Sequence, residues 1–248
     1  MIRRKYLNIL LSQINNDHVK NLQRYQKVLF QRNSLLKNIK DGKSNEIEIE
    51  FWDNRLSEEA ANIFFERNKI IKTIKNSSNQ FAKNFNKNID LNIKYLPKVG
   101  RNLENKFLDS EPSISEIKLI FYESLKKNHS RDIEQRITTI GPHRDDFDII
   151  FNNSPAGITA SRGQSRIISL SLKLSEAKEI RNVTKRNPIL ILDDIFSELD
   201  EKMREKVVSE IIDFDQILLS TADIALIDKT KIKEGKYFSI SDGVIKNN

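Results

Sequence analysis

Residues 160–164 combine residue types that can bind a phosphate group at the start of a helix. Ser161, Gly163 and Gln164 precede a helical pattern, and the amides of a first helical turn attract anions. The glycine permits close approach of the backbone, while the serine hydroxyl and the Gln164 amide can donate hydrogen bonds. Taken by itself, such a segment is more often only a capped helix start. Its position upstream of two carboxylates is what indicates an anion contact.

Those two carboxylates end an apolar strand predicted over residues 189–192. Asp193 and Asp194 follow it directly, and open α/β sheets bind ligands at the carboxyl ends of their strands. Asp193 can hold Mg²⁺, directly or through water, against the β- and γ-phosphates of a nucleotide. Asp194 alternates to the other side, where it can orient or deprotonate an attacking water. An ordinary acidic strand-to-loop junction is the alternative, and residues 197–200, which follow at once, favour the first interpretation.

A complete nucleotide site of this kind also needs a Gly-x-x-x-x-Gly-Lys-[Ser/Thr] loop, and the sequence contains none. Gly42, Lys43 and Ser44 match only the end of that motif, because Lys37 stands where its first glycine belongs. The preceding residues continue a helical pattern, so we interpret residues 41–45 as a polar turn between helices. We therefore expect no ATP hydrolysis by this chain alone.

Composition narrows the class of protein. The chain has 248 residues and no cysteine, which excludes disulfides and thiolate metal sites. No apolar run approaches the roughly 18–20 residues that span a bilayer, and the N-terminus lacks the apolar core of a secretory signal. We expect a cytoplasmic protein with no membrane contact.

Positive charge is concentrated near the N-terminus. The formal net charge is +7, and residues 1–44 carry ten basic residues against Asp17 and Asp41. Such a field attracts phosphate backbones and releases counterions on binding. Arg24, Lys27 and Arg32 are therefore candidate DNA contacts that read no base sequence. A solvated helix face is the alternative.

The first 90 residues carry helical patterns. Asp17 is the predicted N-cap of a helix over residues 18–40, and an apolar seam runs through a longer helix over residues 50–85. Two helices joined by a short turn indicate an antiparallel hairpin arm, with packing onto a globular body as the alternative. The apolar positions of the two seams are Leu22, Tyr25, Leu29, Leu36 and Ile39, then Leu56, Ala60, Ile63, Ile70, Ile74 and Phe81.

After residue 90 the sequence pattern changes from mainly helical to a mixture of strands and helices. We expect strands over residues 91–96 and 147–151, a helix over 113–128 that begins with a Ser113–Glu116 capping box, and a short helix over 132–137. Helix and strand then alternate through 165–183, 189–192, 201–214 and 216–220, which is typical of an α/β layer with parallel strands. We predict an α/β fold with a helical arm lobe over residues 1–138 and a second lobe over 139–248.

Three separated segments together resemble the RecF family of ABC/SMC-like ATPases, and the resemblance covers nearly the whole chain. They are Ile140-Gly141-Pro142-His143-Arg144-Asp145-Asp146, then Gly163-Gln164-Ser165-Arg166 with Leu170-Ser171-Leu172-Lys173-Leu174, then Leu192-Asp193-Asp194-Ile195-Phe196-Ser197-Glu198-Leu199-Asp200. The resemblance implies an incomplete ABC/SMC-like ATPase head of the P-loop NTPase type with a helical hairpin arm. The family's first strands and phosphate loop precede the matching region. We therefore expect an uncovered apolar sheet face that promotes association.

Residue roles follow from the resemblance by position. Ser161, Gly163 and Gln164 would form the signature that contacts the γ-phosphate held by a partner head. Asp193 would serve Mg²⁺ and Asp194 would be the catalytic carboxylate.

The loop that crosses the dimer interface in such ATPases would contain Asp200. Residues 220–222, Ser-Thr-Ala, stand where many heads have a switch histidine.

The resemblance also implies cofactors and partners. Proteins of this family use ATP and Mg²⁺, form ATP-dependent homodimers, and bind single-stranded or gapped DNA. They act with recombination mediator proteins to load recombinase, and they support the SOS response. A nucleotide-independent helical module that binds DNA or protein is the alternative for this chain.

Overall fold

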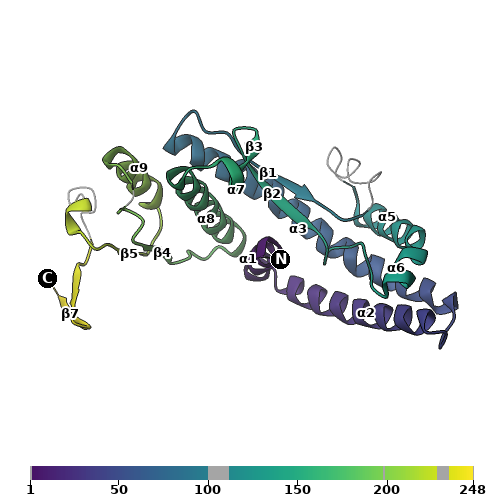
Figure 1. Cartoon of the computed structure of the whole chain (residues 1–248). Coiled ribbons are helices and arrows are strands. Elements are labelled where there is room, and N and C mark those ends of the chain that lie inside the picture. The colour runs from purple at the N-terminus through teal and green to yellow at the C-terminus, as the bar shows by residue number, and fades with distance from the viewer. Residues whose placement is uncertain (1, 100–111, 198, 228–234, 248) are drawn as a thin grey trace. The chain divides into compact units, whose positions relative to one another are not determined.

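The structure of the chain is a computed structural model that describes residues 2–99, 112–197, 199–227 and 235–247 (Figure 1). It divides into two compact units, Met1–Arg186 and Asn187–Asn248. The lobe boundary between residues 138 and 139 stays a prediction.

The first unit is mainly helical, with one small antiparallel sheet. Its elements are α1 (Ile2–Ile14), α2 (Asn16–Lys40), the 3-10 helix η1 (Glu46–Glu48), α3 (Ile49–Phe85), β1 (Leu91–Leu96), α5 (Ile114–Lys127), α6 (His129–Gln135), β2 (Asp146–Phe151), β3 (Ser154–Pro155), α7 (Ala156–Thr159) and α8 (Arg162–Thr184). The two long helices predicted over 18–40 and 50–85 are confirmed to within two residues at each end. The short helix predicted over 132–137 starts three residues earlier than expected.

Helices α2 and α3 form an antiparallel hairpin that lies lengthwise in Figure 1. The polar turn between them is confirmed, and Gly42 adopts φ +70° there, a conformation that favours glycine. The predicted N-cap of α2 is wrong by two residues. Asn15 caps the helix, because its side-chain oxygen accepts a hydrogen bond from the backbone amide of Asp17 at 3.0 Å.

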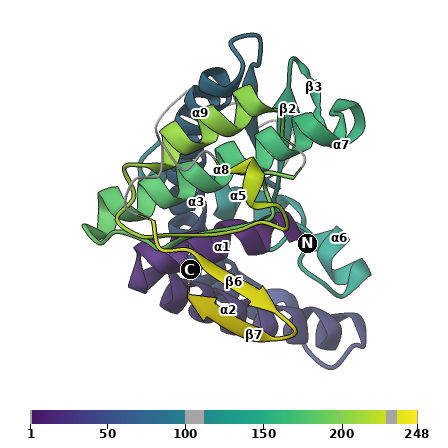
Figure 2. The ribbon, with the colours of Figure 1, turned by 90° about the vertical axis from the view of Figure 1, so that its left-hand side faces the viewer.

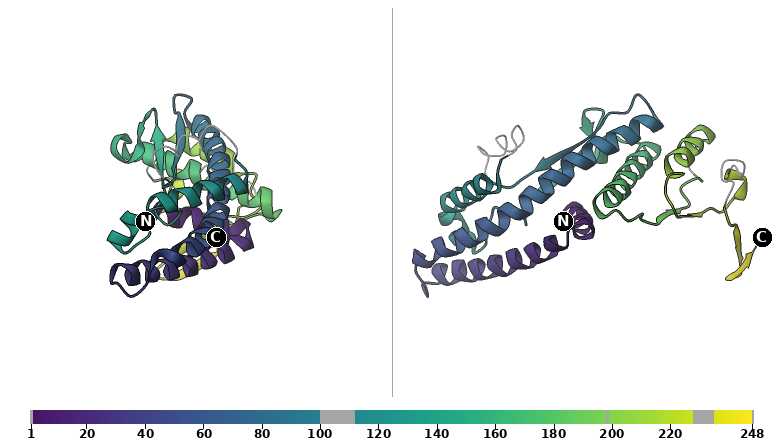
Figure 3. Two further views of the ribbon diagram at one scale, coloured as in Figure 1. Left: turned by 90° about the vertical axis from the view of Figure 1, so that its right-hand side faces the viewer. Right: turned by 180° about the vertical axis from the view of Figure 1, so that it is seen from behind.

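Helix α3 is the centre of the first unit, since α2, α5, α8 and β1 all pack against it. The views in Figures 2 and 3 show α8 beside its C-terminal half and α5 beside its N-terminal half. All six apolar positions of the predicted α3 seam are buried. Each fully buried Leu or Ile contributes about 1.5–3 kcal/mol. Packing on several sides therefore holds α3 in place.

The small sheet has the order β1-β2-β3, and β1 and β2 pair antiparallel from Leu91↔Phe151 to Leu96↔Asp146. The segment that enters β2 passes close to α2 at Gly141, which adopts φ +117°. A Cβ at this position would lie 2.6 Å from the Tyr25 hydroxyl, so only glycine fits. Tight packing thus fixes residues 140–146 against the hairpin.

The described part of the second unit contains two small sheets. Its elements are β4 (Leu190–Asp193), α9 (Glu201–Ile211), β5 (Ile217–Ser220), η2 (Ile224–Leu226), β6 (Phe238–Ser241) and β7 (Val244–Asn247). Strands β4 and β5 are parallel, as predicted. The hairpin of β6 and β7 was not predicted. Its turn residues Asp242 and Gly243 both have positive φ, 51° and 76°, as a type I′ turn requires.

One face of the β4–β5 sheet is open to solvent. Ile191 is 70% exposed, and Ile189 and Leu218 are also exposed, whereas Leu190 and Leu192 on the opposite face are buried. Parallel strands usually bury both faces. The exposed face is the uncovered apolar surface expected from the sequence.

Candidate nucleotide and DNA contacts

The signature residues form the N-terminus of α8. Ser161 is the N-cap, and its hydroxyl accepts a hydrogen bond from the Gln164 amide at 3.3 Å. The Gln164 side-chain oxygen accepts one from the Ser161 amide at 2.8 Å, which completes a capping box. A Cβ at Gly163 would meet nothing within 4 Å, so the space beside this glycine is open.

This helix start can therefore receive an anion. The first amides of a helix have no intrahelical acceptor, and the helix dipole adds partial positive charge. Ser161 and Gly163 are exposed and Gln164 is partly exposed. The capping box fixes the backbone conformation of the first helical turn, while the open side of Gly163 leaves room for a phosphate.

In the second unit, Asp193 and Asp194 lie at the carboxyl end of β4 and are held by Ser220 of β5. The Ser220 hydroxyl donates a hydrogen bond to Oδ1 of Asp193. The Asp194 amide donates to the Ser220 carbonyl and hydroxyl oxygens at 3.2 and 3.1 Å. Asp194 adopts φ +45°, which Asp tolerates better than most residues and which turns the chain sharply. Both carboxylates are exposed.

The loop after β4 is stabilised by its own polar side chains. The Ser197 hydroxyl donates to the Asp194 carbonyl at 3.0 Å and to its carboxylate at 3.1 Å. Asp200 is the N-cap of α9 and accepts a hydrogen bond from the Met203 amide at 2.8 Å. Glu198 lies outside the described residues. The loop thus places Asp200, exposed, at a helix start.

The arrangement fits the chemistry of a nucleotide-bound Mg²⁺. Such a cation takes one or two protein carboxylates and completes its shell with phosphate oxygens and water. The exposed Asp193 carboxylate can supply one ligand, and Ser220 orients it. Asp194 on the same turn can accept a proton from water. Sequence reasoning noted Ser220 only as the residue in place of a histidine. Its role as a positioning residue required the parallel pairing of Asp193 with Ser220.

The first segment of the resemblance, residues 140–146, has a structural role. The buried Asp145 carboxylate accepts hydrogen bonds from the Tyr95 hydroxyl, the Lys98 amide and the Arg67 guanidinium. Burial raises the pKa of Asp145, and the Arg67 charge opposes that rise.

The same segment joins the hairpin through His143. Its Nε2 lies 3.0 Å from the Thr138 carbonyl oxygen, which can only accept, so Nε2 carries the proton. Nδ1 then accepts a hydrogen bond from the Tyr25 hydroxyl at 2.6 Å. Burial lowers the pKa of His143 to about 4, so the ring is neutral near neutral pH.

The three candidate DNA contacts on α2 differ in exposure. Arg24 is exposed and pairs with Glu59, and Lys27 is exposed. Arg32 is 0% exposed. Its guanidinium pairs with Asp53 and with Asp132, each at 2.7 Å. The expected DNA contact by Arg32 is therefore wrong for this structure, because its guanidinium is buried and paired with two carboxylates.

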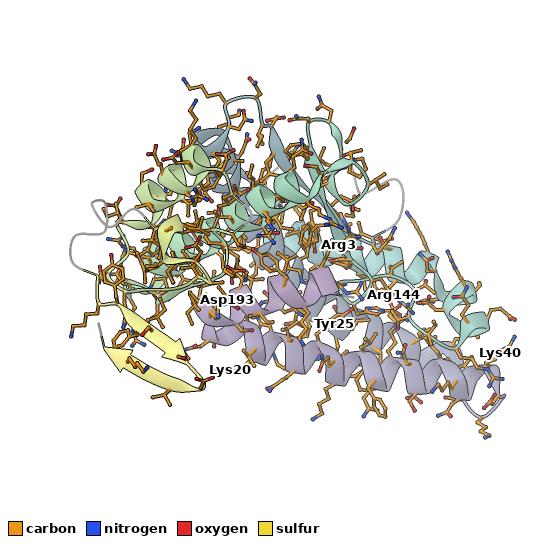
Figure 4. The ribbon with its side chains drawn as sticks, turned by 60° about the vertical axis from the view of Figure 1, so that its left-hand side comes forward. Arg3, Lys20, Tyr25, Lys40, Arg144 and Asp193 are labelled. Atoms are coloured by element: carbon orange, nitrogen blue, oxygen red, sulfur yellow. The ribbon has the colours of Figure 1, made fainter. Side chains whose placement is uncertain are left out.

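Exposed cations nevertheless follow one face of α2. Lys20, Arg24 and Lys27 are spaced i, i+4 and i+7, which places them along one side of a helix. Figure 4 shows Lys20 and Lys40 toward the two ends of α2. No helix in the described part of the chain is long and apolar enough to cross a membrane.

Comparison with known proteins identifies relatives across nearly the whole chain. No family model matches. The DNA replication and repair protein RecF of Thermoanaerobacter sp. strain X514 is 35% identical over 243 residues, which are 98% of this chain and 63% of the relative. The chain thus spans less than two thirds of the length of this relative.

Solved structures agree with this result. A structure of the recombination mediator protein RecF with ATP, described as part of the RecFOR pathway, superimposes with a TM-score of 0.81 and 31% identity over 99% of this chain and 62% of that one. An Smc head domain from Pyrococcus furiosus, with an extended coiled coil, gives a TM-score of 0.50 at 13% identity over 100% of this chain and 57% of that one, which bears on the fold alone. The predicted fold class, an ABC/SMC-like ATPase head with helices, is confirmed.

Proposed function

The chain corresponds to the C-terminal part of the RecF proteins, and on this premise we propose that it acts in DNA replication and repair. The proposed activity is ATP-dependent binding of DNA at single-strand gaps, which supports recombinase loading and the SOS response in the cytoplasm. ATP, Mg²⁺, a second copy of the chain and recombination mediator proteins are the proposed partners.

The carboxylate pair held by Ser220 is the observation that carries this proposal. A hydroxyl that donates to Asp193 and accepts from the Asp194 amide fixes both residues at one strand end. There Asp193 would hold Mg²⁺ and Asp194 would orient water, while the signature at Ser161 would bind the γ-phosphate of a nucleotide on a partner head. Mg²⁺ supplies charge neutralisation of the phosphates when it is bound. Asp200 is proposed to lie at the interface between the two copies.

The cationic face of α2 supports DNA binding. Lys20, Arg24 and Lys27 can contact successive phosphates without reading bases. Such contacts position a protein on DNA and make its affinity depend strongly on salt.

A nucleotide-independent module is the second candidate function. It would use the same basic helix face and no ATP. The open face of the β4–β5 sheet, with Ile191 and Leu218 exposed, favours this candidate, because an exposed apolar surface can bind a protein without a nucleotide.

Salt-dependent binding of gapped DNA tests the proposal. Replacing Arg24 and Lys27 with Gln should weaken binding to all sequences and flatten the slope of log K against log salt by about 1.4–1.8, since each phosphate contact contributes about 0.7–0.9. The matched control is Lys126→Gln on α5, an exposed lysine away from α2. Unchanged affinity and slope in the double variant would refute the α2 contact.

Nucleotide dependence separates the two candidates. Binding is measured with and without ATP and Mg²⁺ for the chain and for its Asp193→Asn and Ser161→Ala variants. An affinity change with ATP that both substitutions abolish supports the ATPase-derived function. The same affinity with and without ATP supports the nucleotide-independent module.

A further inference from the structure

A groove between α3 and α5 lies apart from every residue assigned above to phosphate or DNA. Its α3 side is formed by Glu50, Phe51 and Asn54, and the groove has a volume of about 500 Å³. Its α5 side includes Leu119 and Tyr122. We call it the α3–α5 groove.

Large apolar side chains in and beside the α3–α5 groove are exposed. Phe51 is 60% exposed and Leu119 is 61% exposed. Ile47 in η1 and Ile114 at the start of α5 are exposed as well. Single exposed apolar residues are common, but a group around a concave surface indicates a binding site.

The shape of the α3–α5 groove fits one helix. On α5, the lining residues Ser115, Lys118, Leu119 and Tyr122 are spaced i, i+3, i+4 and i+7. This is one continuous face about 10 Å long at 1.5 Å per residue. Such a wall of two helical turns accommodates a partner helix that presents apolar residues at the same spacing.

The charge around the α3–α5 groove indicates which kind of partner it can bind. Glu46, Glu48 and Glu50 are all exposed on η1 and the start of α3, in a chain whose net charge is +7. Glu50 lines the groove and accepts a hydrogen bond from the Tyr122 hydroxyl. Among the described residues that line the groove, only Lys118 is basic. These carboxylates repel phosphate backbones and attract basic side chains.

The α3–α5 groove is remote from the signature. Ala82, near the C-terminal end of α3, packs in one cluster with Ile168 of α8. Phe51 and Ala82 are 31 residues apart on the same helix. At 1.5 Å per residue this separation is about 46 Å. A ligand in the groove therefore does not compete with a nucleotide at the signature.

We propose that the α3–α5 groove binds an amphipathic helix of another protein, with apolar residues spaced i, i+3 or i+4, and i+7, and with basic flanking residues. The apolar residues pack against Phe51 and Leu119, and the basic residues pair with Glu46, Glu48 and Glu50. This protein-binding site is additional to the proposed DNA and nucleotide contacts.

Fluorescence anisotropy with a synthetic probe tests the proposal. The probe is a labelled helical peptide of about four turns, with Leu along one face and Lys elsewhere. The whole chain should bind it although both are basic, and Phe51→Ser or Leu119→Ser should each weaken binding about tenfold. Changing Glu46, Glu48 and Glu50 together to Gln should weaken binding and remove most of its salt dependence.

Two matched controls accompany these variants. Phe30→Ser removes another exposed aromatic, from α2, where Phe30 is 70% exposed, and should leave binding unchanged. A peptide of the same composition but scrambled order, which lacks the apolar face, should bind at least tenfold more weakly. All replaced side chains are exposed, and thermal melts of each variant verify that it folds.

Four results would overturn the proposal. The probe could fail to bind, or bind the wild type and the Phe51 and Leu119 variants equally. Sedimentation could show that these variants abolish a dimer of the chain without changing probe binding, which would make the groove a self-association surface. The Glu-to-Gln variant could alter affinity for gapped DNA and leave the probe unaffected, which would assign the groove to nucleic acid.

Discussion

Replacing Arg32 with methionine should destabilise the protein strongly. The Arg32 guanidinium donates to Asp53 and Asp132 at 2.7 Å and to the Thr138 hydroxyl at 2.9 Å. All three charged side chains are at most 1% exposed. Methionine fills similar volume but leaves two carboxylates in the core without their cation.

The expected loss follows from this burial. Removing one partner from a buried ion pair costs about 3–5 kcal/mol, because the charge left behind is neither solvated nor paired. His129 Nε2 also contacts Asp53, so this carboxylate keeps one polar partner in the variant. Domains of this kind have free energies of unfolding of about 5–15 kcal/mol, so the variant keeps only part of its stability.

Urea denaturation measures the effect as a shift of the midpoint urea concentration, provided that the slope of the free energy of unfolding against urea concentration stays constant. The control Lys27→Met removes an exposed lysine from the same helix and should change the free energy of unfolding by no more than about 0.5 kcal/mol. A loss below about 1 kcal/mol for Arg32→Met would refute the reasoning. So would weaker DNA binding at unchanged stability, which would restore Arg32 as a phosphate contact.

Three further predictions concern other buried or exposed groups. Burial lowers the pKa of His18 from 6.5 to about 4, so between pH 6.5 and pH 4 the unfolded chain binds more protons and stability falls as pH falls. His18→Leu should lessen that loss in pH-dependent melts. It should also raise stability at pH 7, since both ring nitrogens of His18 lack partners among the described residues. Changing Ile191 and Leu218 to Thr should reduce self-association in light scattering, and unchanged association would show that another surface causes it. Gly141→Ala should cost more than about 1 kcal/mol in denaturation, because its Cβ would overlap the Tyr25 hydroxyl.

Periodicity and capping made most elements predictable from the sequence. The α3 seam, the Ser113–Glu116 capping box and the parallel β4–β5 pair follow local rules, and all three are confirmed. The type I′ turn at Asp242 and Gly243 also obeys a local rule, and Asp-Gly between alternating apolar residues could have revealed the β6–β7 hairpin.

Contacts between distant residues explain what sequence reasoning missed. An arginine that interrupts an apolar seam has the same local pattern whether it faces solvent or buried carboxylates. Asp53 and Asp132, which decide the case for Arg32, are 21 and 100 residues away. The link from Ser220 to Asp193 spans 27 residues and depends on strand register. The predicted roles of Ser161 in phosphate binding, of Asp193 in holding Mg²⁺ and of Asp194 in catalysis stay predictions.

The length of α3 has a mechanical consequence. Its 37 residues form a rod about 55 Å long that no proline interrupts, with α8 packed near one end and the α3–α5 groove at the other. If α3 pivots where α8 packs, a tilt of about 5° moves the α3–α5 groove, about 46 Å away, by about 4 Å. With this length, α3 would amplify a small rotation at the signature helix into a larger displacement of the α3–α5 groove.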